Sequence, residues 1–277
     1  MPVREANRPM HPIAFKIGAL QIHWYGVFLS SAMALGVALY TWLGKRRGYN
    51  ADFLSDACLW MLAGGLLGAR VDAGFHGWER FFVNPFWILD PRQGGFTIHG
   101  AIFGGLLAIY LRFRREKVPF LEGMDMGTAV LFPCMALGRI GCLMQGCCYG
   151  KMATVPWAIT YPGQLSGPRH PVPLYEAGMD LLLWPIVLWV FHRSKRQGQT
   201  MFTVLFLYSI IRFTAEFFRE GPMWGPLSQT QWGSVAIFCL SLPGLVGVYG
   251  GPPRYDPSKG SAPEPRISKG KRKKKER

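Results

Sequence analysis

Seven long apolar segments dominate this sequence of 277 residues. Each segment approaches the ~20 residues that a helix needs to cross the ~30 Å hydrocarbon core of a membrane. The composition agrees, because 49% of the residues are hydrophobic and only 17% are charged, which is apolar for a soluble protein. We therefore predict an all-α polytopic membrane protein with seven transmembrane helices. The predicted spans are residues 22–43, 53–76, 96–111, 122–143, 173–192, 200–218 and 230–249.

Positive charge gathers at one end of alternate segments. The net charge is +15, and basic clusters follow the first, third and fifth predicted spans. These clusters are residues 45–47, 112–117 and 193–196, and the segment 251–277 adds ten basic residues against three acidic ones. If seven spans cross the membrane in alternate directions, all four basic clusters lie on the same side. Because the cytoplasmic side carries the excess of Lys and Arg, we predict an outer N-terminus and an inner C-terminus.

The spans form a single predicted transmembrane domain over residues 1–250, followed by a basic cytoplasmic tail over residues 251–277. Proline, glycine, serine and charged residues dominate this tail, which we expect to be disordered. Its final run, KGKRKKKER, has no interleaved aromatic residues. We therefore expect the basic tail to serve cytoplasmic retention or attraction to anionic lipid headgroups, and not nucleic-acid binding. Residues 3–18 are mixed and polar, so we expect no cleavable signal peptide.

The sixth span carries a polar stripe. An ionisable side chain at membrane depth costs several kcal/mol, roughly, and so needs a partner, a water-filled cavity or a function. In the run YSIIRFTAEFFRE, Tyr208, Arg212 and Glu216 recur at intervals of four and share one helical face. One interpretation is a functional stripe that points into the helix bundle. The other is an ion pair between Arg212 and Glu216 that only locks two helices together.

His99 lies near the outer start of the third span, between GGFT and GAIFGG. Glycine permits close backbone approach in membrane helices. We interpret the glycine-rich surroundings of His99 as space for a ligand beside a titratable group, and the alternative is a hydrogen-bonded residue at the membrane interface. Arg70 is a further charged residue, within the second span.

The run GRIGCLMQGCCYG, residues 138–150, ends the fourth span with polar groups. Arg139 lies near the outer end of this span, and Gly138, Gly141 and Gly146 are expected to thin the helix where its backbone can open. A guanidinium presents a planar fork of donors that suits phosphate and tolerates partial dehydration. Arg139 and Arg212 at headgroup depth therefore point to a phospholipid phosphate as their counter-ion.

The segment Tyr149–Arg169 follows on the outer side, where its aromatic residues and prolines predict an ordered cap over about residues 149–170. His170, Tyr175 and Glu176 then stand at the entrance to the fifth span. Glu176 either stabilises the N-terminus of that helix through its dipole or has a functional role.

These motifs together resemble the prolipoprotein diacylglyceryl transferase family of bacterial inner-membrane enzymes. The similarity runs from the first span to the last and extends through the signature region to Gly150. The matching segments, each with its polar residues, are IHWYG (Tyr25), GGLLGAR (Arg70), FTIHGAIFGG (His99), GRIG (Arg139), RHPVPLYE (His170 and Glu176) and YSIIRFTAEFFRE (Tyr208, Arg212 and Glu216).

The resemblance implies transfer of a diacylglyceryl group from phosphatidylglycerol to the lipobox cysteine of a prolipoprotein signal peptide, in the bacterial inner membrane. On this basis we assign His99 as the base that activates the thiol, because a free thiol is mostly protonated at neutral pH. Arg139 and Arg212 are assigned to the phosphate, and Glu216 to the orientation of Arg212. The predicted substrate-binding residues are Tyr25, Arg70, Gln145, Gly150, His170, Glu176 and Tyr208.

The sequence differs from this family where the family has two asparagines and a glutamate, and here has Cys142, Gln145 and Cys147. Gln145 is a longer amide, whereas the two thiols lack the hydrogen bonds of an amide and the charge of a carboxylate. The difference leaves two alternatives open: a related transferase with another acceptor, or a non-catalytic scaffold that binds lipid. A transporter is a third class, but the sequence has no duplicated pair of interrupted spans of the kind that such folds often have.

The six cysteines divide into two groups. Cys58, Cys134 and Cys239 lie within apolar spans and are expected to be small core residues. Cys142, Cys147 and Cys148 lie near the outer face, where four states are open: a disulfide from Cys142 to Cys147 or Cys148, free thiols, a metal site, or an acceptor or redox role. The spacing C-x4-C-C without a second paired cluster is a poor zinc signal. With no phosphate-binding loop, dinucleotide fingerprint or HExxH motif, we expect no nucleotide or metal cofactor.

Overall fold

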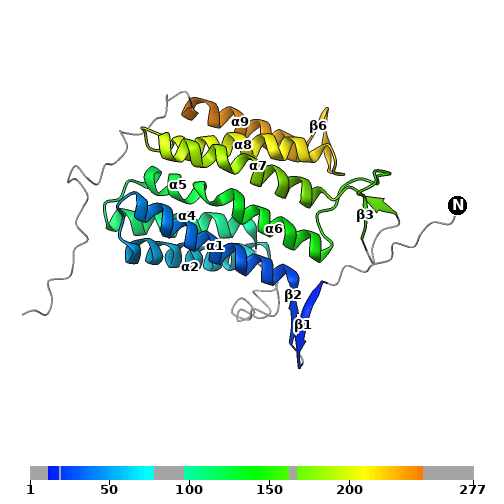
Figure 1. The fold of residues 1–277 in the computed structure, drawn as a ribbon, viewed down its shortest axis with the longest axis horizontal. Helices are drawn as coiled ribbons and strands as arrows, with labels where there is room; N and C mark the ends of the chain where they lie inside the picture. Colours follow the sequence, from blue (N-terminus) through cyan, green and yellow to red (C-terminus); the bar gives the residue numbers. More distant parts are fainter. Residues whose placement is uncertain (1–11, 19, 78–96, 162–166, 246–277) are drawn as a thin grey trace, which may run out of the picture. The chain divides into compact units, whose positions relative to one another are not determined.

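The computed structural model describes residues 12–18, 20–77, 97–161 and 167–245, and these are mostly helical (Figure 1). The helices are α1 (Trp24–Arg46), α2 (Ala51–His76), α4 (Ile98–Arg115), α5 (Phe120–Ala129), α6 (Leu131–Gln145), α7 (Val172–Arg193), α8 (Gln199–Glu216) and α9 (Gln229–Leu245). The chain forms two compact units. Of the described residues, those up to Tyr40 and from Met124 onward belong to the first unit, and Thr41–Gly123 to the second. The predicted tail over residues 251–277 lies outside the described residues.

Three of the described helices are long and apolar enough to cross a membrane: α1, α2 and α7. The pair α5 and α6 is a fourth if it counts as one span. α4 and α8 have 18 residues each and α9 has 17, so these three are at the short end of what crosses hydrocarbon. Large apolar side chains are exposed on the described helices, including Leu182 at 74%, Trp189 at 59% and Leu240 at 72%, as lipid contact requires.

Three short antiparallel hairpins accompany the helices in the described part of the chain. β1 (Ile13–Ile17) pairs with β2 (Leu20–His23), β3 (Ile159–Thr160) with β4 (Pro168–Arg169), and β5 (Met223–Trp224) with β6 (Leu227–Ser228). The first hairpin is irregular between Ile13 and Phe15. Its second strand includes residues 22 and 23, which were predicted as the start of the first span, so that span begins two residues later than expected. The alternation of apolar and polar residues in two such short strands is too brief to be recognised in the sequence next to a long apolar helix.

The predicted fourth span is two helices, α5 and α6, bent by 46°. Pro133 lies in the first turn of α6, and its ring nitrogen has no hydrogen to donate to the carbonyl of Ala129 four residues earlier. Trp184 of α7 supplies the missing donor, because its Nε1 lies 2.9 Å from that carbonyl oxygen. The bend therefore leaves no unpaired carbonyl at Ala129.

α6, α7, α8 and α9 pack in series in the first unit, each against the next. Figure 1 shows α8 beside α7 and α9. The core contains aromatic and branched side chains from different helices. Phe132 of α6, Phe191 of α7 and Ile211 of α8 are each at most 2% exposed. This packing fixes the relative positions of the polar residues on α6, α7 and α8.

α2 and α4 form a close pair in the second unit. Gly64 and Gly68 of α2 meet Gly100 and Gly104 of α4, and a Cβ atom at any of the four would overlap an atom of the other helix. Small residues four apart allow such backbone approach between membrane helices. The face of α4 that Gly100 and Gly104 form, next to His99, is therefore packed against α2. Our interpretation that these glycines make space for a ligand is wrong for this face of α4.

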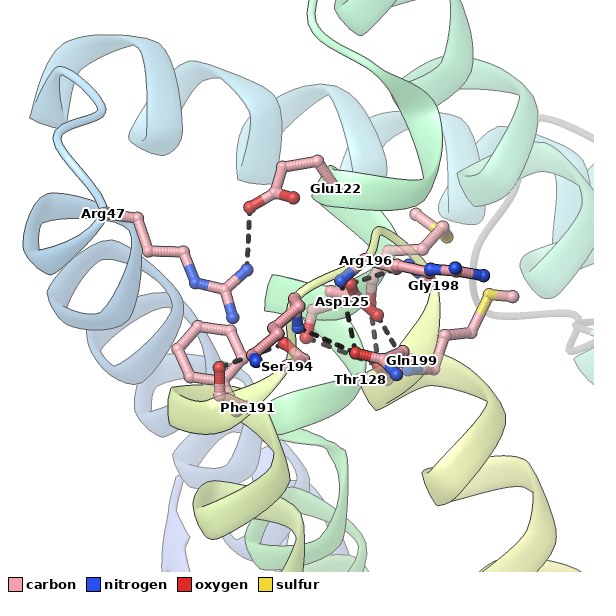
Figure 2. Close-up of polar contacts among 12 residues, drawn as sticks. Arg47, Glu122, Asp125, Thr128, Phe191, Ser194, Arg196, Gly198 and Gln199 are labelled. Carbon is pink, nitrogen blue, oxygen red and sulfur yellow. Dashed lines mark hydrogen bonds and ion pairs between the residues drawn. The ribbon is translucent and has the colours of Figure 1, made fainter. Parts of the chain in front are cut away.

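Polar side chains also hold helix ends and connecting segments in each unit. Asp125 of α5 caps α8 (Figure 2): its carboxylate accepts hydrogen bonds from the backbone nitrogens of Gly198, at 2.8 Å, and Met201, at 2.9 Å. A buried carboxylate at this position satisfies free N–H groups and complements the helix dipole. In the second unit, Arg47 donates to Glu122 at 2.8 Å.

Candidate active site

The carboxylate of Glu176 is the centre of a cluster of arginines in the first unit. Glu176 lies on α7 and its side chain is 1% exposed. Arg139 of α6 approaches Oε2 through Nε at 3.0 Å, and Arg212 of α8 donates through Nη1 to Oε1 at 2.5 Å. Arg219 follows α8 and lies 4.0 Å from Oε2. Three guanidinium groups from separate segments therefore surround one buried carboxylate.

Glu176 does not stabilise the N-terminus of its helix, which was one of two interpretations. α7 begins at Val172 and has no acidic residue in its first turn. Glu176 lies beyond that turn, where the dipole no longer acts strongly on a side chain. Its contacts with α6 and α8 explain its position instead.

The predicted stripe on α8 is present, because Tyr208, Arg212 and Glu216 lie within one unbroken helix. Arg212 Nη2 lies 3.7 Å from Oε2 of Glu216. Glu216 also accepts a hydrogen bond from the hydroxyl of Ser228, at 3.1 Å. Arg212 thus bridges two carboxylates, and the closer one is Glu176. A simple pair between Arg212 and Glu216 does not describe this arrangement.

Asp180 lies one turn after Glu176 on α7 and is fully buried. Neither carboxylate oxygen has a hydrogen-bond partner among the described residues. Arg139 and Glu176 both act on it electrostatically. A buried polar group without a partner is costly, so Asp180 is a further component of this polar site that the sequence did not single out.

α6 continues unbroken through Gly138 and Gly141 and ends at Gln145. Our expectation that the backbone opens at these two glycines is therefore wrong. Gly146 has the left-handed φ of 72° that ends many helices. At Gly141, the close approach of Tyr25 and Phe28 fits only a small residue. α1 thereby brings Tyr25 to the end of α6.

Tyr25 lines a pocket of about 520 Å³ with five other residues of the first unit. These are His23, Cys142, Gln145, Cys147 and Cys148. The predicted substrate-binding residues Tyr25 and Gln145 thus line one cavity with Cys142, Cys147 and Cys148. The sulfur atoms of the three cysteines lie within 4.8 Å of one another.

All six cysteines are free thiols in this structure. Cys58 is buried as expected, but Cys239 is exposed on α9, so it is not a core residue. A disulfide among the outer three stays a prediction. The pKa of Cys148 is lowered to about 5, first because Cys142 hydrogen-bonds to its sulfur and also because Arg219 and Arg139 lie near. Burial raises the pKa of Cys147, and it raises that of Tyr161 to about 12.

The described part of the predicted cap, residues 149–161 and 167–170, is hydrogen-bonded to the chain just after α8. Gly150 donates its N–H to the carbonyl of His170 at 2.9 Å, and Lys151 donates to the carbonyl of Phe218 at 2.8 Å. A Cβ atom at Gly150 would overlap the Phe218 carbonyl oxygen. Arg169 donates to the Gly150 carbonyl at 3.1 Å. Residue 150 must therefore be glycine for the two segments to meet.

His170 lies in an aromatic group at the start of α7. Its Nδ1 is 3.1 Å from the hydroxyl oxygen of Tyr175, which also accepts a hydrogen bond from Nε1 of Trp157 at 2.7 Å. The ring of Phe218 packs edge-on against both His170 and Tyr175. The two predicted residues His170 and Glu176 thus occupy different surroundings, one aromatic and one ionic.

His99 and Arg70 belong to the second unit. His99 is exposed in the first turn of α4, and Arg70 is buried on α2. Near them, Thr97 donates to Asp72 at 2.5 Å and caps α4 by accepting from the N–H of Gly100. Their placement beside the arginine cluster stays a prediction.

Sequence reasoning missed three residues of the cluster: Asp180, Arg219 and Ser228. Arg219 follows Arg212 by seven residues, a spacing that indicates the same helical face. Asp180 follows Glu176 by four residues within an apolar run, and this signal was available. Ser228 belongs to β6, and nothing in its sequence context indicates contact with Glu216.

The apolar helices and the arginines around the buried carboxylate of Glu176 define an α-helical membrane protein with a polar site of paired arginines and carboxylates. Residues 12–246 match the family profile described as prolipoprotein diacylglyceryl transferase. Because the match covers most of the chain, the protein belongs to this family.

Individual relatives share the similarity over most of their length. The phosphatidylglycerol–prolipoprotein diacylglyceryl transferase of Chromohalobacter salexigens is 34% identical over 243 residues, covering 86% of this chain and 87% of the relative. The protein of that name from a Nostoc species is 33% identical over 252 residues, covering 86% and 89%. The one from Coxiella burnetii is 32% identical over 213 residues, covering 76% and 82%.

Proposed function

We propose that the protein transfers the diacylglyceryl group of phosphatidylglycerol to the lipobox cysteine thiol of a prolipoprotein, forming a thioether. The family membership and the names of the relatives support this activity. The observation that carries it is the convergence of Arg139 and Arg212 from separate helices on one anionic group. Such a site is suited to the phosphate of a lipid headgroup.

The reaction replaces a carbon–oxygen bond with a carbon–sulfur bond. The acceptor thiol loses its proton, its sulfur attacks the glyceryl carbon, and glycerol phosphate departs with the bonding electron pair. Negative charge grows on the departing phosphate. Cationic donors that are already in place stabilise this charge in a site of low dielectric constant, an effect worth roughly 3–4 kcal/mol per donor.

The arginines retain donors for this phosphate. Arg139 approaches Glu176 through Nε, so that contact does not use its two terminal amino groups. The side chains of Arg139 and Arg212 are 19% and 18% exposed. Glu176 and Glu216 hold the guanidinium groups in position before the substrate binds. We assign Glu216 to the orientation of Arg212, as the sequence predicted, and we add Glu176 as the principal partner of both arginines.

Gln145 is assigned to the acceptor, because it lines the pocket at the end of α6. Tyr25 lines the same pocket and is assigned to the lipid headgroup. Tyr208 and Arg70 are assigned to the lipid headgroup. Gly150 and His170 are assigned to the predicted outer cap, where they hydrogen-bond to each other through their backbones. These roles follow the family resemblance and the positions of the residues within their own units.

His99 is assigned as the base that accepts the thiol proton. His99→Gln removes a titratable nitrogen and keeps a polar side chain of similar length. We expect turnover to fall at least about 100-fold, since general base catalysis typically contributes 10²–10⁴. His192→Gln is the matched control, because His192 lies in the last turn of α7 and has no assigned role. This variant should keep full activity. Full activity of His99→Gln would exclude the base assignment.

The activity is tested with purified protein in detergent or vesicles. Labelled phosphatidylglycerol and a lipobox peptide are supplied, and the peptide mass and label are measured. We expect a labelled thioether and released glycerol phosphate. A peptide with serine in place of the lipobox cysteine is the control for the acceptor atom. Lipid binding without any thioether would instead indicate a non-catalytic scaffold.

We further propose that seven helical segments cross the bacterial inner membrane, with the N-terminus outside. The bent pair α5 and α6 counts as one span, and α4, α8 and α9 complete the set. Basic residues in the last turns of α1, α4 and α7 support this orientation. Alkaline phosphatase fused after Lys117, Lys151 or Ser194 should be active only at Lys151. Activity at the other two positions would reverse the proposed orientation.

A further inference from the structure

We propose that Cys142, Cys147 and Cys148 bind one thiophilic divalent cation of the Zn²⁺ class, with a fourth position open to the acceptor thiol. This proposal rests on the proposed transferase function for the role of that fourth position. The binding of the cation by the three cysteines stands independently of it. The sequence spacing alone did not predict such a site, and the reason lies in how α6 ends.

The end of α6 brings the three cysteines together. Cys142 lies in the last turn of the helix, and the left-handed Gly146 reverses the chain after it. Cys147 then donates its N–H to the carbonyl of Cys142 at 3.0 Å. Cys148 has a φ of 60°, which is rare for a residue with a side chain. Such conformations persist where surrounding structure enforces them, and they are frequent at functional sites.

The separations suit a common metal ion. The three sulfur atoms lie within 4.8 Å of one another. Tetrahedral zinc with bonds of about 2.3 Å to sulfur requires sulfur atoms about 3.8 Å apart. A disulfide would use two of the thiols and leave the third unexplained, whereas a metal ion uses all three.

The cluster has the ligand number of a catalytic site. Structural zinc sites use four protein ligands, and catalytic sites use three and keep one position open. The cysteines line the pocket of about 520 Å³ together with Tyr25 and Gln145. His23 lines the same pocket, but its ring nitrogens do not belong to the group of mutually close ligand atoms. The pocket therefore offers the fourth position to a bound molecule.

The charge balance supports an anionic metal–thiolate group. Three thiolates and one divalent cation carry a net charge of −1. Arg139 and Arg219 both act electrostatically on Cys148. These arginines compensate the charge of the assembled site, and Arg139 connects it to Glu176. The proposed metal thus lies near Arg139, one of the two arginines assigned to the phosphate.

The role of such a site would be to activate the acceptor thiol, which would bind the metal as the fourth ligand. A thiol that coordinates a metal ion is deprotonated, so the acceptor cysteine would be held as a thiolate beside the lipid. Its proton passes to a base or to water, its sulfur bonds to the glyceryl carbon, and glycerol phosphate leaves. The metal changes neither charge nor oxidation state. Removal of the thioether product reopens the fourth position.

The test is metal binding by the full-length protein, purified in detergent under reducing conditions and freed of metal. Co²⁺ is added as a spectroscopic probe, and Zn²⁺ content is measured by mass spectrometry. We expect one metal per chain and an absorption band from thiolate-to-cobalt charge transfer. Cys142→Ser, Cys147→Ser and Cys148→Ser should each weaken binding by at least about 100-fold. Cys239→Ser, which alters an exposed cysteine on α9, is the control and should bind normally.

Size-exclusion chromatography and circular dichroism establish that each variant is folded. Absence of stoichiometric binding to folded wild-type protein would overturn the site, as would normal binding by the three serine variants. The open position is tested by adding a lipobox peptide to the cobalt form. The peptide should shift the absorption band, and its cysteine-to-serine version should not. An unshifted band would overturn the open position.

Labelled thioether formation separates the metal proposal from the transferase function. Transfer by protein without metal would overturn the catalytic role of the cation and leave the transferase function intact. Stoichiometric metal binding and a peptide-dependent band shift, without transfer under any condition, would overturn the transferase function and leave the cation site intact.

Discussion

Arg212 donates a hydrogen bond to Glu176 across 36 residues of sequence, from α8 to α7. Arg139 of α6 forms an ion pair with the other oxygen of the same carboxylate. Glu176 therefore joins three helices of the first unit at the level where the headgroup phosphate is proposed to bind. A buried ion pair of this kind orients donors more effectively than it stabilises the fold, because desolvation offsets much of the attraction.

Replacing Glu176 with Gln should destabilise the protein. The substitution keeps the size of the side chain but leaves Arg139 and Arg212 without their shared charge. Removing one partner of a buried ion pair lowers the free energy of unfolding by about 3–5 kcal/mol. Because both arginines are partly exposed, we expect a loss of about 3 kcal/mol. Thermal unfolding in detergent measures it. Glu220→Gln is the control, because Glu220 is 65% exposed and lies 3.7 Å from Arg169. Equal unfolding temperatures for the two variants would contradict the central role of Glu176.

Replacing Arg212 with Lys tests the planar fork. Lysine keeps the charge but cannot contact Glu176 and Glu216 with separate nitrogens while also binding phosphate. We expect the turnover number to fall by about 100-fold, as for the loss of one donor in comparable sites. Arg193→Lys is the control, because Arg193 is the last residue of α7 and has no assigned role. It should change the turnover number by less than about twofold. Wild-type turnover of Arg212→Lys would show that charge alone is sufficient.

Gly150→Ala should disrupt the outer segment. The added Cβ overlaps the Phe218 carbonyl oxygen, and backbone on both sides must move. We expect lower yield of folded protein and loss of transfer activity. Gly138→Ala is the matched control, because a Cβ there meets no atom within 4 Å. Its folding and activity should match wild type. If both variants behaved alike, close packing would not be the reason for glycine at position 150.

Trp184→Phe should destabilise the bend between α5 and α6. The substitution leaves the buried carbonyl of Ala129 without its donor, at a cost of about 1–3 kcal/mol. Trp189→Phe provides the comparison, since Trp189 is on the same helix but 59% exposed. Thermal unfolding should separate the two variants by several degrees, with the Trp184 variant lower. A larger loss for Trp189→Phe would exclude the proposed role of the indole nitrogen.

The helices themselves follow from local sequence. Apolar runs near membrane length predicted the described helical segments, and the interval of four placed Tyr208, Arg212 and Glu216 on one face. Periodicity and length are properties of a single segment, so they are readable without a structure. The motifs around Arg139, Glu176 and Arg212 also indicated the family before any contact was known.

Contacts between segments depended on the tertiary structure. The sequence placed Glu176 at a helix entrance, but only packing of α6, α7 and α8 brings Arg139 and Arg212 to its two oxygens. Likewise, C-x4-C-C is a weak pattern until Gly146 reverses the chain and places three sulfurs within reach of one ion. Sequence determines which side chains a segment presents, whereas the angle and separation of segments arise from side-chain packing between residues far apart in the chain. For this reason the sequence alone predicted the membrane class and the arginines, and the folded chain decided their partners.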